Sequence, residues 1–298
     1  MNTPHLGNGS VGAPITRGGI SIFPVYLGES DLPPISTGPT AGLIIDEVPG
    51  GDVSHLVVTN PTDRAILIVE GEQLVGGLQN RSPNVSVLVP AGGRLEIPVS
   101  CLERGRWGLH DSFSPGTTHT PRRVRRTKNR EVARSMAASG IRSGNQGAVW
   151  SAVHKELKLM DVASGTDAIA DADVVFERDP DRYSAVGELV STGPLPGQCG
   201  IVISHGRRAV AAEVFGAPDL LAAHWAALIR SGFLELPTAE GRPSATSALK
   251  LLRRFATAEA TRSPGIGLGT EHHIATDQVS GQALILDDSV VHAGIFAR

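Results

Sequence analysis

The chain has 298 residues, 41% of them hydrophobic, and a formal net charge of −3. It can therefore bury a sizeable core, and its overall charge favours no polyanionic partner, which argues against general nucleic-acid binding. No apolar run reaches the roughly 18 residues that a membrane span requires, and residues 1–19 lack the pattern of a secretory signal. With only two cysteines, Cys101 and Cys199, the sequence predicts a cytoplasmic protein without membrane contact.

The first half of the chain alternates short β-type runs with turns. Residues 1–19 are rich in Gly, Pro and Ser, which predicts a flexible N-terminal arm, and residues 20–298 are predicted to form a single domain. Runs of Val, Ile and Leu bounded by turn residues indicate strands. The predicted strands cover residues 43–45, 55–58, 65–69, 85–89 and 95–99, with turns at 60–63 and 91–93.

The middle of the chain changes character. Residues 110–128 are polar and contain proline, and we interpret them as a long loop in which the basic run 122–130 is solvated or starts a helix. Capping residues and apolar spacing then predict three helices. One begins after Asn145 with an apolar stripe at 149, 153, 157 and 160, one runs from Pro218 to Gly232, and one begins after Ser244.

The C-terminal third again shows β patterns. Residues 199–203 and 209–215 flank a turn at 205–206, and the last thirty residues predict a three-strand meander that turns at 287–288. Hairpins and helices are interleaved irregularly instead of forming repeated βαβ units. This favours an α+β fold with an antiparallel β-rich N-terminal half, helices packed on sheets and a C-terminal β meander.

A dense polar cluster follows the strand predicted at 65–69. Glu70 and Glu72 are separated by one glycine, and Gln79, Asn80 and Arg81 come shortly after them. Amide donors, amide acceptors and a planar guanidinium suit a polar ligand that carries a phosphate or carboxylate. The same residue types are common in solvated turns, so both interpretations stay open on the residues alone.

A second cluster follows the strand predicted at 95–99. Cys101 shares a face with the apolar residues of that strand, so it is either a small buried hydrophobe or, with His110 as base, a nucleophile. Arg106 can bind a diphosphate and Trp107 can stack on a ring, whereas the alternative is a tryptophan that caps the edge of the core. Glu103 lies within this cluster and is a candidate general base.

The histidines raise a further hypothesis. Glu271, His272 and His292 could hold a metal, but adjacent strand residues face opposite sides, and His292 has the apolar neighbours of a structural residue. The chain has no HExxH, no paired CxxC, no GxGxxG after a strand and no P-loop pattern. We therefore assign no metal ligand among the site residues, and the sequence specifies no cofactor.

Two motifs resemble signatures of a known family. The segments EGEQLVGGLQNR at 70–81 and PVSCLERGRW at 98–107 resemble those of the bacterial ADP-ribosylglycohydrolase and rhodanese-phosphatase associated protein domain family. Residues 146–150, 213–215 and 291–296 are similar to later family segments, so the resemblance covers most of residues 20–298. The chain departs from the pattern at Glu213, where we expect Asp, and at 205–207, where a Gly-rich turn is usual. The resemblance implies binding or processing of an NAD- or ADP-ribose-derived molecule.

We therefore predict an enzyme or binder that acts on a small anionic nucleotide of the ADP-ribose type. The arginines would hold the diphosphate, the tryptophan would stack on a ring, and the amides would bond ribose hydroxyls or a base edge. The predicted ligand contacts are Gln79, Asn80, Arg81, Arg106 and Trp107, and the candidate catalytic bases are Glu72 and Glu103. The rival hypotheses are a non-catalytic ligand-sensing or partner-binding module and a metal-dependent hydrolase. We expect Arg106 to contribute more to binding than the run 122–130, which the sequence places on a mobile loop.

Overall fold

Short strands dominate the first half of the protein. The structure is a computed structural model that describes residues 6–106, 108 and 112–298. Its N-terminal strands are β1 (Ser10–Val11), β2 (Ile15–Arg17), β3 (Ile20–Tyr26), β4 (Ile35–Thr37), β5 (Ile44–Glu47), β6 (His55–Thr59), β7 (Ala65–Ile68), β8 (Leu74–Val75), β9 (Arg81–Pro83), β10 (Val87–Val89), β11 (Arg94–Cys101) and β12 (Ser114–Pro115). All five strands predicted for this half of the chain are present.

Helices and a second set of strands make up the rest. The helices are α1 (Arg122–Ser139), α2 (Gln146–Leu159), α3 (Val174–Arg178), α4 (Pro180–Thr192), α5 (Pro218–Leu234) and α6 (Ala245–Thr257). The strands are β13 (Gly200–His205), β14 (Arg208–Phe215), β15 (Thr261–Pro264), β16 (Thr270–Ala275), β17 (Val279–Leu286) and β18 (Ser289–Ala297). The predicted α+β class and the C-terminal meander are confirmed, and no helix in the described part of the chain is long and apolar enough to cross a membrane.

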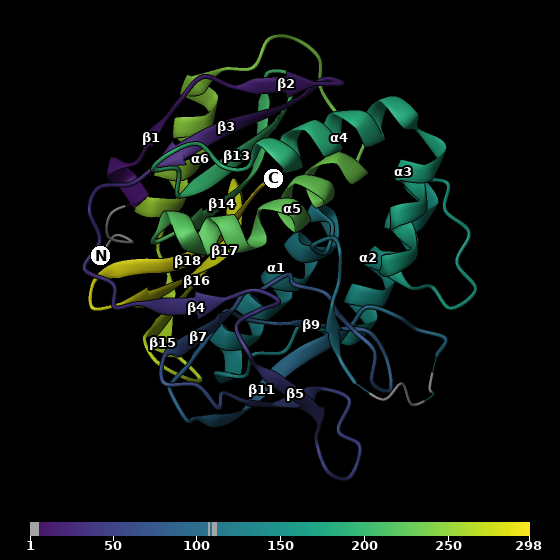
Figure 1. Cartoon of the computed structure of the whole chain (residues 1–298), viewed down its shortest axis with the longest axis vertical. Coiled ribbons are helices and arrows are strands. Elements are labelled where there is room, and N and C mark those ends of the chain that lie inside the picture. The colour runs from purple at the N-terminus through teal and green to yellow at the C-terminus, as the bar shows by residue number, and fades with distance from the viewer. Residues whose placement is uncertain (1–5, 107, 109–111) are drawn as a thin grey trace.

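Three sheets organise these strands (Figure 1). The largest has the order β1-β3-β13-β14-β18-β17-β16-β15, with β2 also paired to β3. The other two have the orders β12-β8-β9-β11-β6-β5 and β10-β7-β4. Pairings are antiparallel apart from that of β4 with β7, which is parallel. β1 and β2 lie within the segment that the sequence predicts as a flexible arm, and Leu6 is buried there.

Helices α5 and α6 cover opposite faces of the largest sheet. Alternate residues of a strand point to opposite faces, so Ile22 and Ile201 join the cluster that contains α5, whereas Phe23 and Val202 join the cluster that contains α6. The helices themselves begin as predicted, because the side chains of Asn145 and Ser244 cap α2 and α6. Helix α5 continues past Gly232 to Leu234.

Helix α1 corrects the expectation of a basic loop. It starts at Arg122, packs against α2, β16 and β17, and lies near the middle of the molecule (Figure 1). Arg125 and Lys128 are buried in the same stripe as Val124 and Val132. Charged side chains are seldom buried unless they are paired, and the sequence gives no sign that distant carboxylates meet this helix. The run is therefore not a mobile loop.

The buried charges of α1 form one network with two glutamates. The Arg125 guanidinium contacts Glu70 Oε2 at 2.9 Å and Glu213 Oε1 at 2.5 Å, and Lys128 Nζ lies 3.0 Å from Glu70 Oε1. Burial by itself would raise the pKa of Glu70, but Arg125 and Lys128 hold that pKa at about 2. His292 joins the network through Glu213, with 3.1 Å between Nε2 and Oε2. Two cations and two anions thus balance one another away from water.

We predict that Arg125→Met lowers the free energy of unfolding by about 3–5 kcal/mol, because it leaves the buried Glu213 without its arginine and Glu70 with Lys128 alone. The matched control is Arg134→Met on the same helix, where the arginine is exposed and pairs with Glu131, and where the expected change is at most about 1 kcal/mol. Chemical denaturation of both variants measures the difference. Equal losses would contradict the role given to Arg125.

Candidate functional site

A tight turn separates the two glutamates of the EGE motif. The Glu72 N–H donates to the Val69 carbonyl over 3.2 Å, and Gly71 at the third position has a φ of 95°, as a type II turn requires. Glu70 enters the buried ionic network, whereas Glu72 faces a cavity. Side chains two residues apart in a regular strand would share a side; the turn gives these two different surroundings.

The cavity beside Glu72 has a volume of about 120 Å³ and mostly apolar walls. Its polar groups are few: Glu72, Gln73, His119 and His224, together with Ser114. Glu72 Oε2 accepts from the Val69 N–H over 3.2 Å, so the carboxylate is folded back onto its own turn and Oε1 stays available. A small set of convergent polar groups in an apolar hollow is the usual form of a ligand site. Apolar wall residues are Leu43, Ile45, Ile66, Leu67, Ile68, Leu74, Phe113 and Ala227.

Helix α5 and strand β4 fix the orientation of His224. Its Nε2 lies 2.7 Å from Thr37 Oγ1, and the Thr37 hydroxyl lies 2.7 Å from the Leu67 carbonyl. A carbonyl can only accept, so both contacts are satisfied when Thr37 donates to Leu67 and accepts from the His224 Nε2–H. The other ring nitrogen, Nδ1, then carries a lone pair that points at Glu72 Oε1, 3.2 Å away.

His119, which lies in the segment before α1, is the third residue of the group with Glu72 and His224. Its N–H donates to the Ala227 carbonyl and the next N–H, of Thr120, donates to the Gly71 carbonyl, so its backbone is held at both ends. The side chain is 2% exposed, and neither ring nitrogen has a hydrogen-bond partner among the residues that the structure describes. One ligand atom each from Glu72, His119 and His224 lies within 4.8 Å of the other two.

Burial governs the charges in this cavity. It raises the pKa of Glu72 to about 7, although the Val69 N–H opposes the shift. It lowers the pKa of His224 to about 3, with His292 and Arg125 adding to the effect, and it lowers the pKa of His119 well below its usual value. Both imidazoles are therefore neutral at pH 7.

The sequence-predicted residues Asn80, Glu103 and Arg106 come together in a second place. Arg106 Nε donates to Glu103 Oε2 over 2.9 Å, and Arg106 Nη2 donates to Asn80 Oδ1 over 2.9 Å. Arg106 also donates to the carbonyls of Gly76 and Gly77. Glu103 accepts from the Thr166 hydroxyl as well. These contacts fasten the loop before β9; the predicted Trp107 and His110 lie outside the described residues.

Gln79 and Arg81 are the other predicted contacts, and both are fully buried. Gln79 Oε1 accepts from Arg81 Nη1 over 3.4 Å, whereas Gln79 Nε2, Arg81 Nε and Arg81 Nη2 have no hydrogen-bond partner within the described residues. The predicted contacts therefore divide into a fastened set, with Asn80 and Arg106, and a buried pair with unused donors.

The residues of the metal hypothesis drawn from the sequence do not meet. Glu271 pairs with Arg142 and with His273, whereas His292 bonds to Ser86 and Glu213. Over the described ranges, groups of possible ligands occur at Glu72–His119–His224 and at Asp52–His55–Glu96. The reason is topological, because β16 carries Glu271 two strands away from β18, which carries His292.

A serine, a histidine and a glutamate are also connected inside the core. Ser86 Oγ lies 2.8 Å from His292 Nδ1, and His292 Nε2 lies 3.1 Å from Glu213 Oε2. Serine hydrolases also link a nucleophile, a base and an acid, but there the serine bonds to Nε2 of the histidine and the acid bonds to Nδ1. Here Ser86 is 1% exposed and Glu213 is neutralised by Arg125, so a substrate has no route to the hydroxyl and the arrangement is structural.

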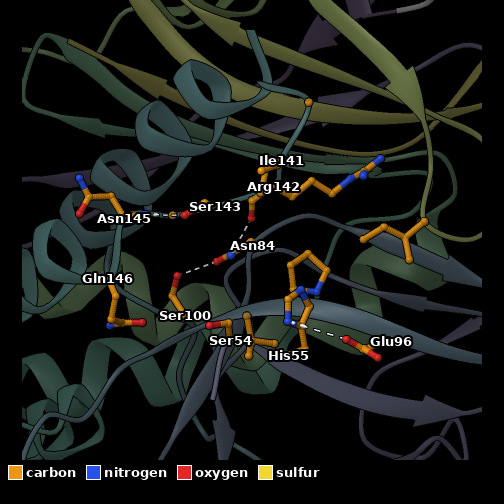
Figure 2. A pocket seen from close by; sticks show the side chains of 15 residues that line it. Ser54, His55, Asn84, Glu96, Ser100, Ile141, Arg142, Ser143, Asn145 and Gln146 are labelled. Atoms are coloured by element: carbon orange, nitrogen blue, oxygen red, sulfur yellow. Dashed lines mark hydrogen bonds and ion pairs between the residues drawn. The ribbon is translucent and has the colours of Figure 1, made fainter. Parts of the chain in front are cut away.

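A larger groove lies elsewhere on the protein, between β6, β11 and the segment that joins α1 to α2. It encloses about 490 Å³, and Figure 2 shows Asn84 near its centre, bonded to Ser100 and to the Arg142 carbonyl. His55 and Glu96 stand at its rim, 3.8 Å apart. The polar side chains of this groove are mostly amides and hydroxyls, and its one arginine already pairs with Glu271. The histidine and glutamate of this groove are exposed, whereas the smaller cavity holds a carboxylate and two imidazoles with less exposure.

The sequence predicts Glu72 as a candidate base but does not predict the two histidines that the structure places beside it. His224 falls between Leu221 and Leu228 in the apolar stripe of α5, and a polar residue at such a position was the available signal. His119 belongs to a polar, irregular segment, and no spacing ties it to Glu72. Thr37 on β4 meets His224 only through the folded chain.

The fold and the cavity define an α+β protein with a partly buried carboxylate–imidazole site. The chain belongs to the family of the ARPP-1 domain, the ARG and Rhodanese-Phosphatase-superfamily-associated Protein domain, whose model matches residues 8–296. ARG denotes ADP-ribosylglycohydrolase, so the family name associates this domain with ADP-ribosylglycohydrolases and with rhodanese-phosphatase proteins. No curated protein and no solved structure matches the chain.

We predict that Gly71→Ala destabilises the protein by roughly 2 kcal/mol more than Gly92→Ala does. Both glycines have positive φ, so each substitution carries a backbone cost of about 1–2 kcal/mol. A Cβ at Gly71 would collide with the Arg125 guanidinium, whereas a Cβ at Gly92 would meet nothing within 4 Å. Denaturation of the two variants gives the comparison, and similar losses would show that the turn does not constrain Arg125.

The cysteines give a second prediction. Burial raises the pKa of the Cys101 thiol and of the Cys199 thiol, and both side chains are buried. We expect neither thiol to react rapidly with Ellman's reagent at pH 8 in the native protein, and both to react after unfolding, since the thiolate is the reactive form. A fast native reaction that Cys101→Ser abolishes would favour the nucleophile hypothesis.

Proposed function

We propose that this protein is a hydrolase of an ADP-ribose-derived nucleotide, with the reaction in the cavity of Glu72, His119 and His224. One observation carries the proposal: a carboxylate and two neutral imidazoles converge within 4.8 Å in an apolar hollow. Groups of these types activate water and transfer protons in hydrolytic enzymes. The family's association with ADP-ribosylglycohydrolases supports the substrate class.

The reaction adds water across one bond of the substrate. The hydroxide part of the water goes to the electrophilic carbon or phosphorus, and the remaining proton goes to the leaving group. The cavity holds only about 120 Å³, less than the roughly 300 Å³ at which ligand pockets begin. The reacting end of the nucleotide therefore enters the cavity while its remainder stays outside.

Of the predicted ligand contacts, Gln79 and Arg81 keep donors that have no partner within the described residues, and such donors favour an anion. Both side chains are fully buried, so a phosphate would reach them only after a local opening of the structure. Asn80 and Arg106 already bond to each other, so their proposed role is to hold the loop that carries Gln79. Glu103 shares this supporting role through its bond to Arg106.

Turnover tests the proposal. The full chain is incubated with NAD, ADP-ribose and an ADP-ribosylated peptide, and products are separated by chromatography. We expect hydrolysis of at least one compound and a loss of roughly 100-fold or more in Glu72→Gln, the scale of a lost proton-transfer group. Glu96→Gln, an exposed glutamate at the other groove, is the matched control and should retain activity.

Two outcomes would go against the proposal. Thermal stabilisation by a nucleotide without any product would favour the non-catalytic ligand-sensing module instead. Full activity in Glu72→Gln would place the reaction outside this cavity. The first outcome concerns catalysis and the second concerns location, so the assay separates them.

A further inference from the structure

We propose that Glu72, His119 and His224 bind one divalent transition-metal ion, with zinc as the reference case. The site would supply two imidazole nitrogens and one carboxylate oxygen, which leaves at least one position on the metal for water. This inference deepens the proposed function and rests on it for its role in turnover. Metal binding itself is measured without any substrate.

The orientation of His224 is the first argument. Its Nε2–H is used by Thr37, so its Nδ1 lone pair faces Glu72 Oε1 at 3.2 Å. Two electron pairs at that distance repel each other unless a cation or a proton lies between them. Metal-binding histidines usually donate their other N–H to an oxygen that fixes the ring, and Thr37 provides that oxygen here.

The second argument is the unsatisfied state of His119. A proton shared by Glu72 and His224 would satisfy those two residues but would leave both nitrogens of His119 without a partner in a buried position. Buried polar groups in folded proteins nearly always have partners. A metal ion between the three residues gives one nitrogen of His119 a partner, since it takes the lone pair of that nitrogen.

The spacing and the donor types fit such an ion. Bonds of about 2.0–2.2 Å in tetrahedral geometry place ligand atoms roughly 3.3–3.6 Å apart. The Glu72–His224 pair stands at 3.2 Å already, and the whole set lies within 4.8 Å, so His119 needs a small ring movement. Two imidazoles favour zinc and its neighbours over magnesium or calcium, which prefer oxygen ligands.

A second group of possible ligands in the chain serves as the internal rival. Asp52, His55 and Glu96 also have ligand atoms within 4.8 Å, but their side chains are 38–55% exposed. Hydrogen bonds from the Ser54 N–H and His55 to Asp52 already account for that arrangement. Metal affinities of variants at His119 and at His55 therefore show which of the two groups binds the ion.

The experiment starts from the full chain treated with a chelator and then dialysed. Calorimetric titration with Zn²⁺, and the visible absorption of added Co²⁺, should give one ion per chain. We expect His119→Ala and Glu72→Gln each to weaken binding by roughly 100-fold or more, beyond the 10–100-fold typical of outer partners. His55→Ala should bind like the parent.

Thr37→Val tests the orientation of His224 without removing a ligand. It deletes the acceptor of the Nε2–H while keeping the shape of the side chain, so we expect affinity to fall by about 10–100-fold. Thr37→Ser, which restores the hydroxyl, should recover most of that loss. Melting temperatures measured in chelator identify any variant that is unfolded. If the ligand variants are unfolded, the comparison of Thr37→Val with Thr37→Ser still tests the site.

The possible results separate this inference from the proposed function. Loss of the ion in His55→Ala but not in His119→Ala would overturn the inference, and so would the absence of stoichiometric binding in the parent. Hydrolysis that persists in chelator yet needs Glu72 would overturn the metal while the function stands. Stoichiometric zinc at His119 without any turnover would support the metal and leave the proposed function refuted.

Discussion

The ion pairs of Arg125 constrain the rest of the structure. From α1, this one guanidinium reaches Glu70, in the turn after β7, and Glu213 on β14 of the largest sheet. It thereby joins two β regions that share no ladder in the described part of the chain. Desolvating such charges is costly unless every partner is in place. A displacement of the two β regions relative to each other would separate these charges from their partners. Gly71 and Gly294 leave the room that the guanidinium occupies, because a Cβ at either would collide with it.

The same contacts determine the cavity. Glu70 and Glu72 belong to one four-residue turn, so holding Glu70 in the network also fixes the direction of Glu72. Thr120, just before α1, donates to the carbonyl of Gly71 in that turn, which sets the position of the neighbouring His119. On the other side, Phe215 stacks on His224 at 5.4 Å and touches His292 at 4.8 Å between ring centroids. The polar site is thus built directly on the ionic network.

Local patterns predicted the fold far better than the site. Alternation and turn residues identify β6 and β11, and capping by Asn145 and Ser244 identifies α2 and α6, because these signals act within a few residues. The sequence leaves a helix start in the basic run open but does not predict that Arg125 and Lys128 are buried. The carboxylates that pair with Arg125 lie at least 55 residues away along the chain. Glu72 was found through its motif. His119, His224 and Thr37 were not, since only tertiary contacts bring them together.

The charge of the network also affects the chemistry of the cavity. Beyond the effect of burial, Arg125 disfavours a proton on His224, and Arg125 and Lys128 both disfavour one on His119. These cations thus favour the neutral imidazoles, although Glu70 and Glu213 pair with them. A histidine held neutral is able to accept a proton or bind a cation, whereas a charged one can do neither. The two glutamates of the motif therefore have complementary tasks: Glu70 stabilises the cations, and Glu72 offers the one negative group that the cavity contains.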